Sequence, residues 1–316
     1  MKKKTILVTG GLGYLGARLC LFLKSTGFKV VIGSSRKSAK LPKILTGCSL
    51  SFIDLNNVKL LNSVCGNVDY VIHLASINAQ LSQKNPKLAT EINGIGTFNL
   101  IQASVSNNVE YFLYFSTAHV YGSPLIGDIS EVMLLKPTHP YSISHRLAED
   151  FLLEALASNK IKGDIIRLSN TVGAPLLKEN DCWMLFVNDA CRQAVVGRRI
   201  IINSDPNSER DFIAMSSVHK VVGYFLDNKP DSDFPVYNLG SGDSSSLLKV
   251  AQLVARRCEV LYGYFPELIY PMTDDKPSIP LRYNVDKLTN KIKYKPGNSL
   301  TSSIDEVLKF CKLEFG

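Results

Sequence analysis

Tyr141 and His145 have the residue types and the spacing that proton transfer requires. They stand four positions apart in the segment Tyr-Ser-Ile-Ser-His. On a helix this spacing puts both side chains on one face, one turn apart. A phenol beside a basic side chain can give a proton to a carbonyl oxygen or take one from an alcohol. The pair therefore predicts acid–base chemistry at an oxygen atom.

A second group of reactive side chains follows a β-rich segment at 111–115. Residues 115–122 read Phe-Ser-Thr-Ala-His-Val-Tyr-Gly. Because the carboxyl ends of parallel strands meet at one edge of a sheet, this run and the tyrosine helix should meet there. Thr117 and Tyr141 can then converge on one substrate oxygen and stabilise negative charge that develops on it. His119 either faces the substrate or fills space beside the sheet edge.

A glycine-rich segment near the N-terminus predicts a nucleotide cofactor. Residues 9–16 read Thr-Gly-Gly-Leu-Gly-Tyr-Leu-Gly, after an apolar strand at 4–9 and at the start of a helix at 13–26. Small residues permit a tight turn and close approach of a pyrophosphate, and the helix N-terminus favours its negative charge. The cofactor contacts expected here are Gly10, Gly11, Leu12, Gly13, Tyr14, Leu15 and Gly16.

The end of the second strand bears on which cofactor is bound. That strand, 29–32, is followed by Gly33, Ser34, Ser35 and Arg36, with no acidic residue. An acid there would bond the ribose hydroxyls, whereas arginine accommodates a 2′-phosphate. The sequence thus favours NADP(H) over NAD(H), unless Arg36 is an ordinary solvated loop charge.

Further cofactor contacts are expected where later strands end. They are Asp54, Leu55, Leu74, Ala75 and Ser76, together with Tyr141 and His145. Asp54 is equally able to cap the following helix. His73 is expected to be a scaffold residue bonded to backbone.

The first half of the chain alternates strands and helices, which predicts an α/β fold with a Rossmann-type doubly wound parallel sheet. Beyond the segments given above, strands are expected at 50–53, 70–74 and 164–168 and helices at 88–105 and 141–157. After about residue 170 short strands (199–202, 236–239) mix with helices (217–226, 246–258, 300–310). We expect an NAD(P)-binding domain at 1–170 and a smaller mixed α/β substrate lobe at 171–316, with the chain allowed to cross between them.

The composition restricts the functional class. The chain has 316 residues, 45% of them hydrophobic and 20% charged, which suits a globular protein with a full core. No apolar run approaches the ~18 residues of a membrane helix, and the seven scattered cysteines are typical of a cytoplasmic protein. The net charge of +8 suits anionic phosphates, but no dense basic run indicates nucleic-acid binding. No His or Cys spacing typical of a metal site is present.

Together these motifs resemble the extended short-chain dehydrogenase/reductase family of nucleotide-sugar epimerases, dehydratases and reductases. The resemblance covers nearly the whole chain. It implies that Tyr141 is the general acid/base, that Thr117 assists it, and that His145 contacts the nicotinamide ribose. It also implies a homodimer, for which 88–105 and Phe151, Leu152 and Leu156 could supply the interface, although core packing explains them equally well.

The resemblance extends to the second half and implies a nucleotide-diphosphate sugar as substrate. Asn170, in Arg-Leu-Ser-Asn-Thr-Val-Gly at 167–173, and Arg210, in Arg-Asp-Phe-Ile at 210–213, match residues that contact the diphosphate. Lys276 stands where the family usually has arginine. The alternative is that Asn170 and Arg210 have only structural roles.

Two departures from the family pattern limit which of the family's reactions we expect. The family dehydratases carry Asp-Glu after the Ser/Thr, where this chain has Ala118 and His119, so dehydration is not expected. His145 replaces the usual lysine. With a reference pKa of ~6.5, histidine is mostly neutral at neutral pH and stabilises tyrosinate less. We expect this to impair alcohol oxidation, which needs tyrosinate, more than ketone reduction, which needs the phenol.

The leading hypothesis is NADPH-dependent reduction of a nucleotide-activated 4-keto hexose, as in polysaccharide biosynthesis, with Tyr141 as proton donor. One alternative is a nucleotide-sugar 4-epimerase. Another, of a different class, is a non-catalytic nucleotide-binding or regulatory subunit.

Overall fold

The structure, a computed structural model, describes residues 3–228, 232–272, 280–293 and 300–316. The chain forms two compact units. Unit 1 comprises Met1–Ser123, Leu134–Arg167 and Gly223–Tyr237; unit 2 comprises Pro124–Met133, Leu168–Val222 and Asn238–Gly316. Over these described residues, none of the helices combines the length and the apolar character needed to cross a membrane.

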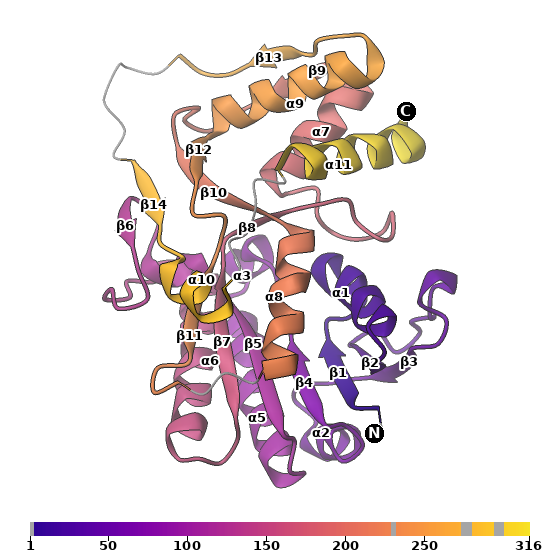
Figure 1. Cartoon of the computed structure of the whole chain (residues 1–316), viewed down its shortest axis with the longest axis vertical. Helices are drawn as coiled ribbons and strands as arrows, with labels where there is room; N and C mark the ends of the chain where they lie inside the picture. The colour runs from indigo at the N-terminus through magenta and orange to yellow at the C-terminus, as the bar shows by residue number, and fades with distance from the viewer. Residues whose placement is uncertain (1–2, 229–231, 273–279, 294–299) are drawn as a thin grey trace. The chain divides into compact units, whose positions relative to one another are not determined.

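A seven-stranded sheet, counted over the described residues, has the order β11-β7-β5-β4-β1-β2-β3 (Figure 1). Neighbouring strands from β3 to β5 pair in parallel. Its strands are β1 (Thr5–Thr9), β2 (Lys29–Ser34), β3 (Ser49–Phe52), β4 (Tyr70–His73), β5 (Tyr111–Thr117), β7 (Gly163–Leu168) and β11 (Val236–Leu239). This arrangement confirms the predicted Rossmann-type fold. The predicted strand at 236–239 joins this sheet, beside β7, so the second half of the chain completes it.

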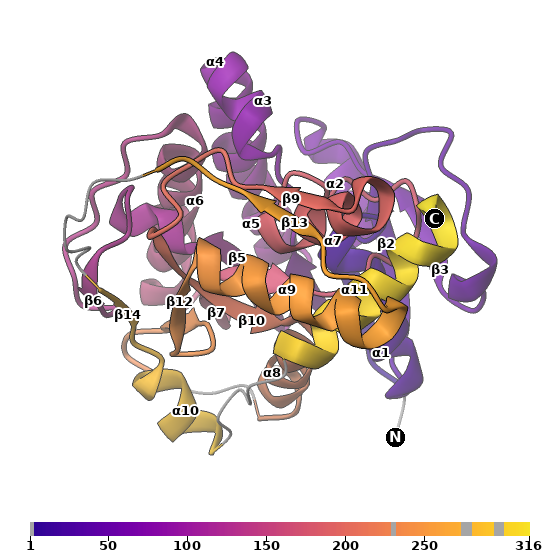
Figure 2. The ribbon, with the colours of Figure 1, turned by 90° about the horizontal axis from the view of Figure 1, so that it is seen from above.

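Helices cover both faces of the sheet. Figure 2 shows α1 on one side and α2, α5 and α6 on the other. The helices before β7 are α1 (Tyr14–Ser25), α2 (Val58–Cys65), α3 (Ala79–Lys84), α4 (Pro86–Ala89), α5 (Gly96–Ser106) and α6 (Pro140–Ala157), with short 3-10 turns η1 (Lys43–Leu45) and η3 (Ala118–Tyr121). A buried core forms between the sheet and α2, α5 and α6, and includes Leu61, Leu100, Phe112 and Leu152.

The predicted helix at 88–105 is interrupted. The structure instead has α4, then a π-helical turn η2 (Thr90–Ile95), then α5. Hydrophobic spacing cannot distinguish a π turn from an α turn, because both continue a helical path. This turn has a role in the site described below.

Unit 2 contains smaller sheets and its own core. Its strands are β6 (Gly127–Ile129), β8 (Asn170–Val172), β9 (Arg199–Ile201), β10 (Glu209–Ala214), β12 (Ser244–Ser246), β13 (Glu267–Ile269) and β14 (Leu281–Tyr283). Its helices are α7 (Phe186–Gly197), α9 (Leu247–Tyr262), α10 (Asp286–Ile292) and α11 (Leu300–Phe315), while α8 (Met215–Asn228) runs from unit 2 into unit 1. Apolar faces of α7, α9 and α11 pack around Cys191, Val254 and Leu308.

Candidate active site

The helix α6 holds Tyr141 in its first turn. His139 is the N-cap, and its ring Nδ1 accepts a hydrogen bond from the Tyr141 backbone N–H at 3.1 Å. Ser142 closes the capping box by accepting from the His139 N–H at 3.3 Å. Pro140 occupies the first turn, where its missing N–H costs nothing. The helix therefore begins at a fixed position directly beside the tyrosine.

Farther along, a buried ion pair fastens α6 to β7. Both carboxylate oxygens of Glu149 accept from the Arg167 guanidinium, at 3.0 and 2.8 Å. The remaining Arg167 nitrogen Nη1 donates to the Tyr121 hydroxyl at 2.9 Å. Moving α6 away from β7 would leave two buried charges without their partners, which is strongly unfavourable. This contact therefore holds the helix on the sheet.

The phenol of Tyr141 lies beside two hydroxyls, that of Thr117 at the end of β5 and that of Ser76 after β4. Burial raises the pKa of Tyr141 to about 12, while the two hydroxyls, which stabilise tyrosinate, oppose that rise. The hydroxyl of Thr117 also accepts from the backbone N–H of His119. Tyr141 is therefore protonated at neutral pH and stands among hydroxyl groups at the carboxyl edge of the sheet.

His145 lies one turn beyond Tyr141, as the helical spacing predicts. The ring centroids are 4.5 Å apart with an interplanar angle of 62°. Burial, and secondarily the neighbouring His119, lowers the pKa of His145 to about 3. The imidazole is thus neutral at physiological pH and supplies no charge to Tyr141. Its Nδ1 lies 2.7 Å from the hydroxyl of Tyr114.

His73 is a scaffold residue, but threonine hydroxyls rather than backbone groups satisfy its ring. Its Nδ1 lies 2.6 Å from Thr9 Oγ1 and its Nε2 lies 2.8 Å from Thr97 Oγ1. Thr9 Oγ1 also accepts from the N–H groups of Leu74 and Ala75, each at 3.2 Å. Burial lowers the pKa of His73 to about 3. The neutral ring therefore ties the start of the glycine-rich turn to the loop after β4.

The π turn η2 presents Asn93 to two parts of the site. Its Oδ1 accepts from the Ile77 N–H at 2.8 Å, and its Nδ2 donates to Ser144 Oγ at 3.0 Å. Ser144 in turn donates to the backbone carbonyl of Tyr141 at 2.9 Å. Asn93 thereby joins the loop that carries Ser76 to the helix that carries Tyr141.

A cavity of about 450 Å³ lies at the carboxyl edge of unit 1. Six of the predicted cofactor contacts line it: Gly10, Ser35, Asp54, Leu55, Ala75 and Ser76. Thr9, Gly33, Phe52, Ile53, Ile77, Leu88 and Ile92 complete the lining. Its position matches the edge at which parallel α/β sheets bind dinucleotides.

The glycine-rich turn has the geometry that a pyrophosphate requires. Gly10 has a φ of +66°, and a Cβ on Gly16 would lie 2.3 Å from the Gly10 carbonyl oxygen. The N-terminus of α1 has no side-chain cap and no acidic residue in its first turn. Small residues, close packing and a helix end that no carboxylate blocks all fit a dinucleotide.

The other predicted cofactor residues, Tyr141 and His145 on α6 among them, do not line this cavity. Ser34 ends β2, and Arg36 and Leu74 follow the ends of β2 and β4. The turn and the start of α1 contain Gly11, Leu12, Gly13, Tyr14, Leu15 and Gly16. Ser34 is buried and accepts from the Arg36 N–H at 3.3 Å. The alternative that Asp54 caps the next helix is wrong, because Asn57 caps α2.

The predicted substrate contacts that the structure describes in unit 2 lie on β8 and β10. Asn170 donates to the backbone carbonyl of Asp211 at 2.9 Å. The Asp211 carboxylate accepts from Ser169, Ser241 and Gly242. Arg210, which precedes it, is exposed and forms no ion pair with the part of the chain that the structure describes. Lys276 lies outside the described residues.

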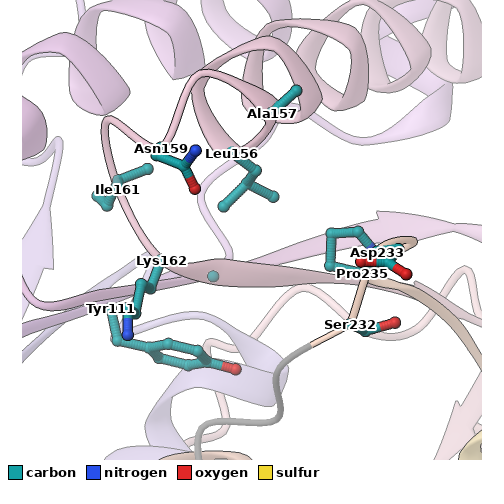
Figure 3. Close-up of a pocket in the computed structure, with 10 residues that line it drawn as sticks. Tyr111, Leu156, Ala157, Asn159, Ile161, Lys162, Ser232, Asp233 and Pro235 are labelled. Atoms are coloured by element: carbon teal, nitrogen blue, oxygen red, sulfur yellow. The ribbon is translucent and has the colours of Figure 1, made fainter.

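A second cavity, of about 490 Å³, lies at the opposite end of the strands (Figure 3). Tyr111 and Gly163, the first residues of β5 and β7, line it, together with Asn159, Lys162 and Asp233. None of the predicted site residues does so. Amino ends of parallel strands are not where such sheets bind dinucleotides, so this cavity is separate from the candidate site.

Comparison with known proteins agrees with this geometry. Residues 6–240 match the NAD dependent epimerase/dehydratase family. The chain belongs to this family. It is 30% identical over 285 residues, 80% of each chain, to a UDP-glucose 4-epimerase from Cyamopsis tetragonoloba.

Solved structures share the fold of this family member. The UDP-glucose 4-epimerase of Thermotoga maritima with UDP-glucose superimposes with a TM-score of 0.84 at 20% identity, covering 99% of this chain and 100% of the other. RMD from Pseudomonas aeruginosa complexed with NADPH gives 0.77 at 22% identity, covering 98% and 99%.

Several residues that organise this epimerase-family site escaped the sequence analysis. Asn93 and Thr97 had a weak signal, since they are four residues apart and would share one face of a helix. Tyr114 had none, because a tyrosine within a buried strand resembles ordinary core. Its contact with His145 is visible only once β5 and α6 are in place.

Proposed function

We propose that this family member is an NADPH-dependent reductase of a nucleotide-activated 4-keto hexose. The observation that carries the proposal is the charge state of the pair on α6. Tyr141 has a pKa of about 12 and His145 a pKa of about 3. Both are neutral at physiological pH, and a neutral phenol is the form that donates a proton to a carbonyl oxygen.

In this proposal the cofactor supplies a hydride, and the chain supplies the proton. Tyr141 donates to the substrate oxygen that becomes the hydroxyl. The hydroxyls of Thr117 and Ser76, which lie beside the phenol, stabilise the tyrosinate that remains. His145 holds its place through Tyr114 and contributes hydrogen bonding without charge.

The preference for NADPH over NADH rests on the end of β2. Ser35 lines the cofactor cavity, and Arg36 follows it with an exposed guanidinium. Among the described residues that line the cavity, Asp54 is the one acidic group, and it follows β3 rather than β2. Its Oδ1 accepts from the Asn56 N–H at 3.0 Å. A 2′-phosphate beside Arg36 would gain a charge-assisted hydrogen bond.

For the substrate we propose a nucleotide diphosphate bound by Asn170 and Arg210, with His119 and Lys276 as further contacts. Asp211 accepts four hydrogen bonds, which anchor the loop at Ser241 and Gly242 beside this motif. The exposed Arg210 guanidinium can bind phosphate in a bidentate manner. UDP-sugars in the names of similar proteins favour a uridine nucleotide.

A 4-epimerase is the second candidate, because several of the similar proteins are UDP-glucose 4-epimerases. An epimerase must both oxidise an alcohol and reduce a ketone in each cycle. Tyr141 would then have to work as tyrosinate in one half and as phenol in the other. The neutral His145 assists only the second half.

We also propose that the protein is a cytoplasmic homodimer. Of the residues expected at the interface, Leu152 is buried in the unit 1 core, and the Phe151 ring packs 4.7 Å from Phe98. The exposed side chains of Ile95 and Ile143, on η2 and α6, are better candidates for the interface. Light scattering of the purified protein distinguishes a dimer from a monomer.

The deciding assay measures NADPH and NADH oxidation with a panel of nucleotide 4-keto hexoses. A reductase consumes one reduced cofactor for each sugar. Conversion of UDP-glucose and UDP-galactose into each other without net cofactor use would replace this proposal with the epimerase. Nucleotide binding without either reaction would indicate a non-catalytic subunit.

A further inference from the structure

Tyr114 links two buried histidines beneath the candidate active site. Its ring stacks on His73, with centroids 5.6 Å apart, and on His145, with centroids 6.0 Å apart. Its hydroxyl lies 2.7 Å from His145 Nδ1. Tyr114 and His145 are only 2% and 3% exposed. Solvent therefore does not compete for this hydrogen bond.

The direction of the bond follows from the partners. Burial raises the pKa of the Tyr114 hydroxyl well above its usual range, so the hydroxyl keeps its hydrogen. Among the described residues, His145 Nδ1 is its one hydrogen-bond partner. The neutral imidazole has one acceptor nitrogen and one N–H. Tyr114 therefore donates to Nδ1, and the ring hydrogen of His145 lies on Nε2.

The resulting N–H group lacks an acceptor within the described chain. His145 Nε2 is buried and has no hydrogen-bond partner among these residues. Leaving a buried donor unsatisfied costs about 1–3 kcal/mol. An oxygen atom of a bound ligand would satisfy this N–H group.

We propose that Tyr114 is a positioning residue that fixes His145 as the Nε2–H tautomer and so orients a neutral donor toward an oxygen of the bound cofactor. The inference rests on the proposed function, because it takes a nicotinamide dinucleotide as the ligand. It assigns a task to Tyr114, which is 2% exposed and does not line the cofactor cavity. It also explains how histidine serves at this position: a fixed tautomer supplies a directed hydrogen bond that a mixture of tautomers would supply only part of the time.

Tyr114→Phe tests the proposal because it removes the hydroxyl and keeps the stacked ring. Histidine labelled with ¹⁵N reports the tautomer, since protonated and unprotonated ring nitrogens have different chemical shifts; His145→Phe assigns the signals. We expect wild-type His145 to carry its hydrogen on Nε2 alone. In Tyr114→Phe we expect a mixture of the two tautomers.

NADPH affinity, measured by fluorescence titration, provides the second readout. Tyr114→Phe should weaken NADPH binding about 3- to 10-fold, the range for one lost neutral hydrogen bond. In a His145→Phe background the same change should have no further effect, because Tyr114 acts through the imidazole. Tyr111→Phe is the matched control, because Tyr111 (Figure 3) is buried at the other end of β5. The change removes its hydroxyl, which donates to Asp164 at 2.5 Å. It should alter neither the tautomer nor NADPH affinity.

Three results would overturn the proposal: an Nδ1–H tautomer in the wild type, unchanged NADPH affinity in Tyr114→Phe, or an equal loss in both backgrounds. Equal loss would mean that Tyr114 only supports the fold. These measurements use no sugar. Failure to reduce any nucleotide sugar would therefore refute the proposed function and leave this inference standing, whereas a wild-type chain that binds neither NADPH nor NADH would refute both.

Discussion

Replacing His145 with lysine should move the titration of Tyr141 into the range of an ordinary assay. In the wild type, burial holds the pKa of Tyr141 at about 12, and the neutral imidazole 4.5 Å away does not oppose it. A lysine ammonium at that position favours tyrosinate. The change should therefore lower the pKa of Tyr141.

The structure sets the size of this effect. Raising a phenol from its usual pKa near ~10 to about 12 corresponds to about 3 kcal/mol against tyrosinate. A unit charge at the 4.5 Å separation of the two rings contributes about 4 kcal/mol in an effective dielectric of ~20. Burial of the ammonium reduces this attraction, so the two effects roughly cancel. We expect the pKa of Tyr141 to return toward its ordinary value.

The assay is the pH dependence of kcat/KM in both directions, with ketone and NADPH, and with alcohol and NADP⁺. At any one pH the equilibrium constant of the reaction fixes the ratio of the two kcat/KM values. The informative quantity is therefore the pH at which each profile changes slope. In the wild type, reduction should be flat and oxidation should rise tenfold per pH unit from about pH 6 to 11. In His145→Lys, the change of slope should lie near pH ~10, where oxidation levels off and reduction begins to fall.

His145→Gln is the matched control, because it keeps a polar side chain without charge. It should show no change of slope between about pH 6 and 11, whatever its absolute rate. An identical profile in all three proteins would refute the reasoning, since the charge at this position would then not control Tyr141. A break near neutral pH in the wild type would refute it as well.

Three further predictions concern the scaffold and the cofactor. Gly16→Ala places a Cβ 2.3 Å from a backbone carbonyl oxygen. The free energy of unfolding, measured in urea, should fall by more than ~2 kcal/mol, and NADPH binding should be lost. Gly197→Ala is the control and should change neither, because the nearest atom to its Cβ is a side-chain atom at 3.5 Å. Burial lowers the pKa of His73 to about 3, so the folded state favours its neutral form. The contribution of His73 to the free energy of unfolding is therefore fully present above the unfolded pKa near ~6.5. It falls by about 2 kcal/mol at pH 5 and continues to fall toward pH 3. His73→Asn should flatten that dependence in urea titrations at several pH values, and an unchanged slope would contradict it. Arg36→Ala should weaken NADPH binding about 10-fold and NADH binding less than ~2-fold, with a smaller effect for Lys37→Ala; equal losses for the two cofactors would remove the argument for NADP(H).

The parts of the fold that sequence patterns predicted are those with a strong local signal. The Rossmann strands are short apolar runs, and the turn at residues 9–16 carries a glycine pattern that few other structures need. The pair Tyr141 and His145 follows from helical spacing alone. The π turn η2 has no comparable signal, because the sequence of a π turn resembles that of an α-helix.

Other parts depend on contacts between distant segments. The strand β11 joins the sheet although it follows the unit 2 residues 168–222, and its sequence does not identify its neighbour. The pKa values of Tyr141 and His145 depend on burial, which requires the packed structure. The sequence predicts that His145 is mostly neutral at pH 7. Burial lowers its pKa further, so the imidazole is neutral across the whole physiological pH range.

The most direct test of the central claim follows the hydride into the sugar. NADPH deuterated at the transferred position is incubated with a nucleotide 4-keto hexose, and the product is examined by mass spectrometry and NMR. We expect one deuterium at C4 for each NADPH consumed, and loss of this reaction in Tyr141→Phe. No deuterium in the sugar and no NADPH consumed, with interconversion of UDP-glucose and UDP-galactose in a parallel incubation, would contradict the proposed reduction.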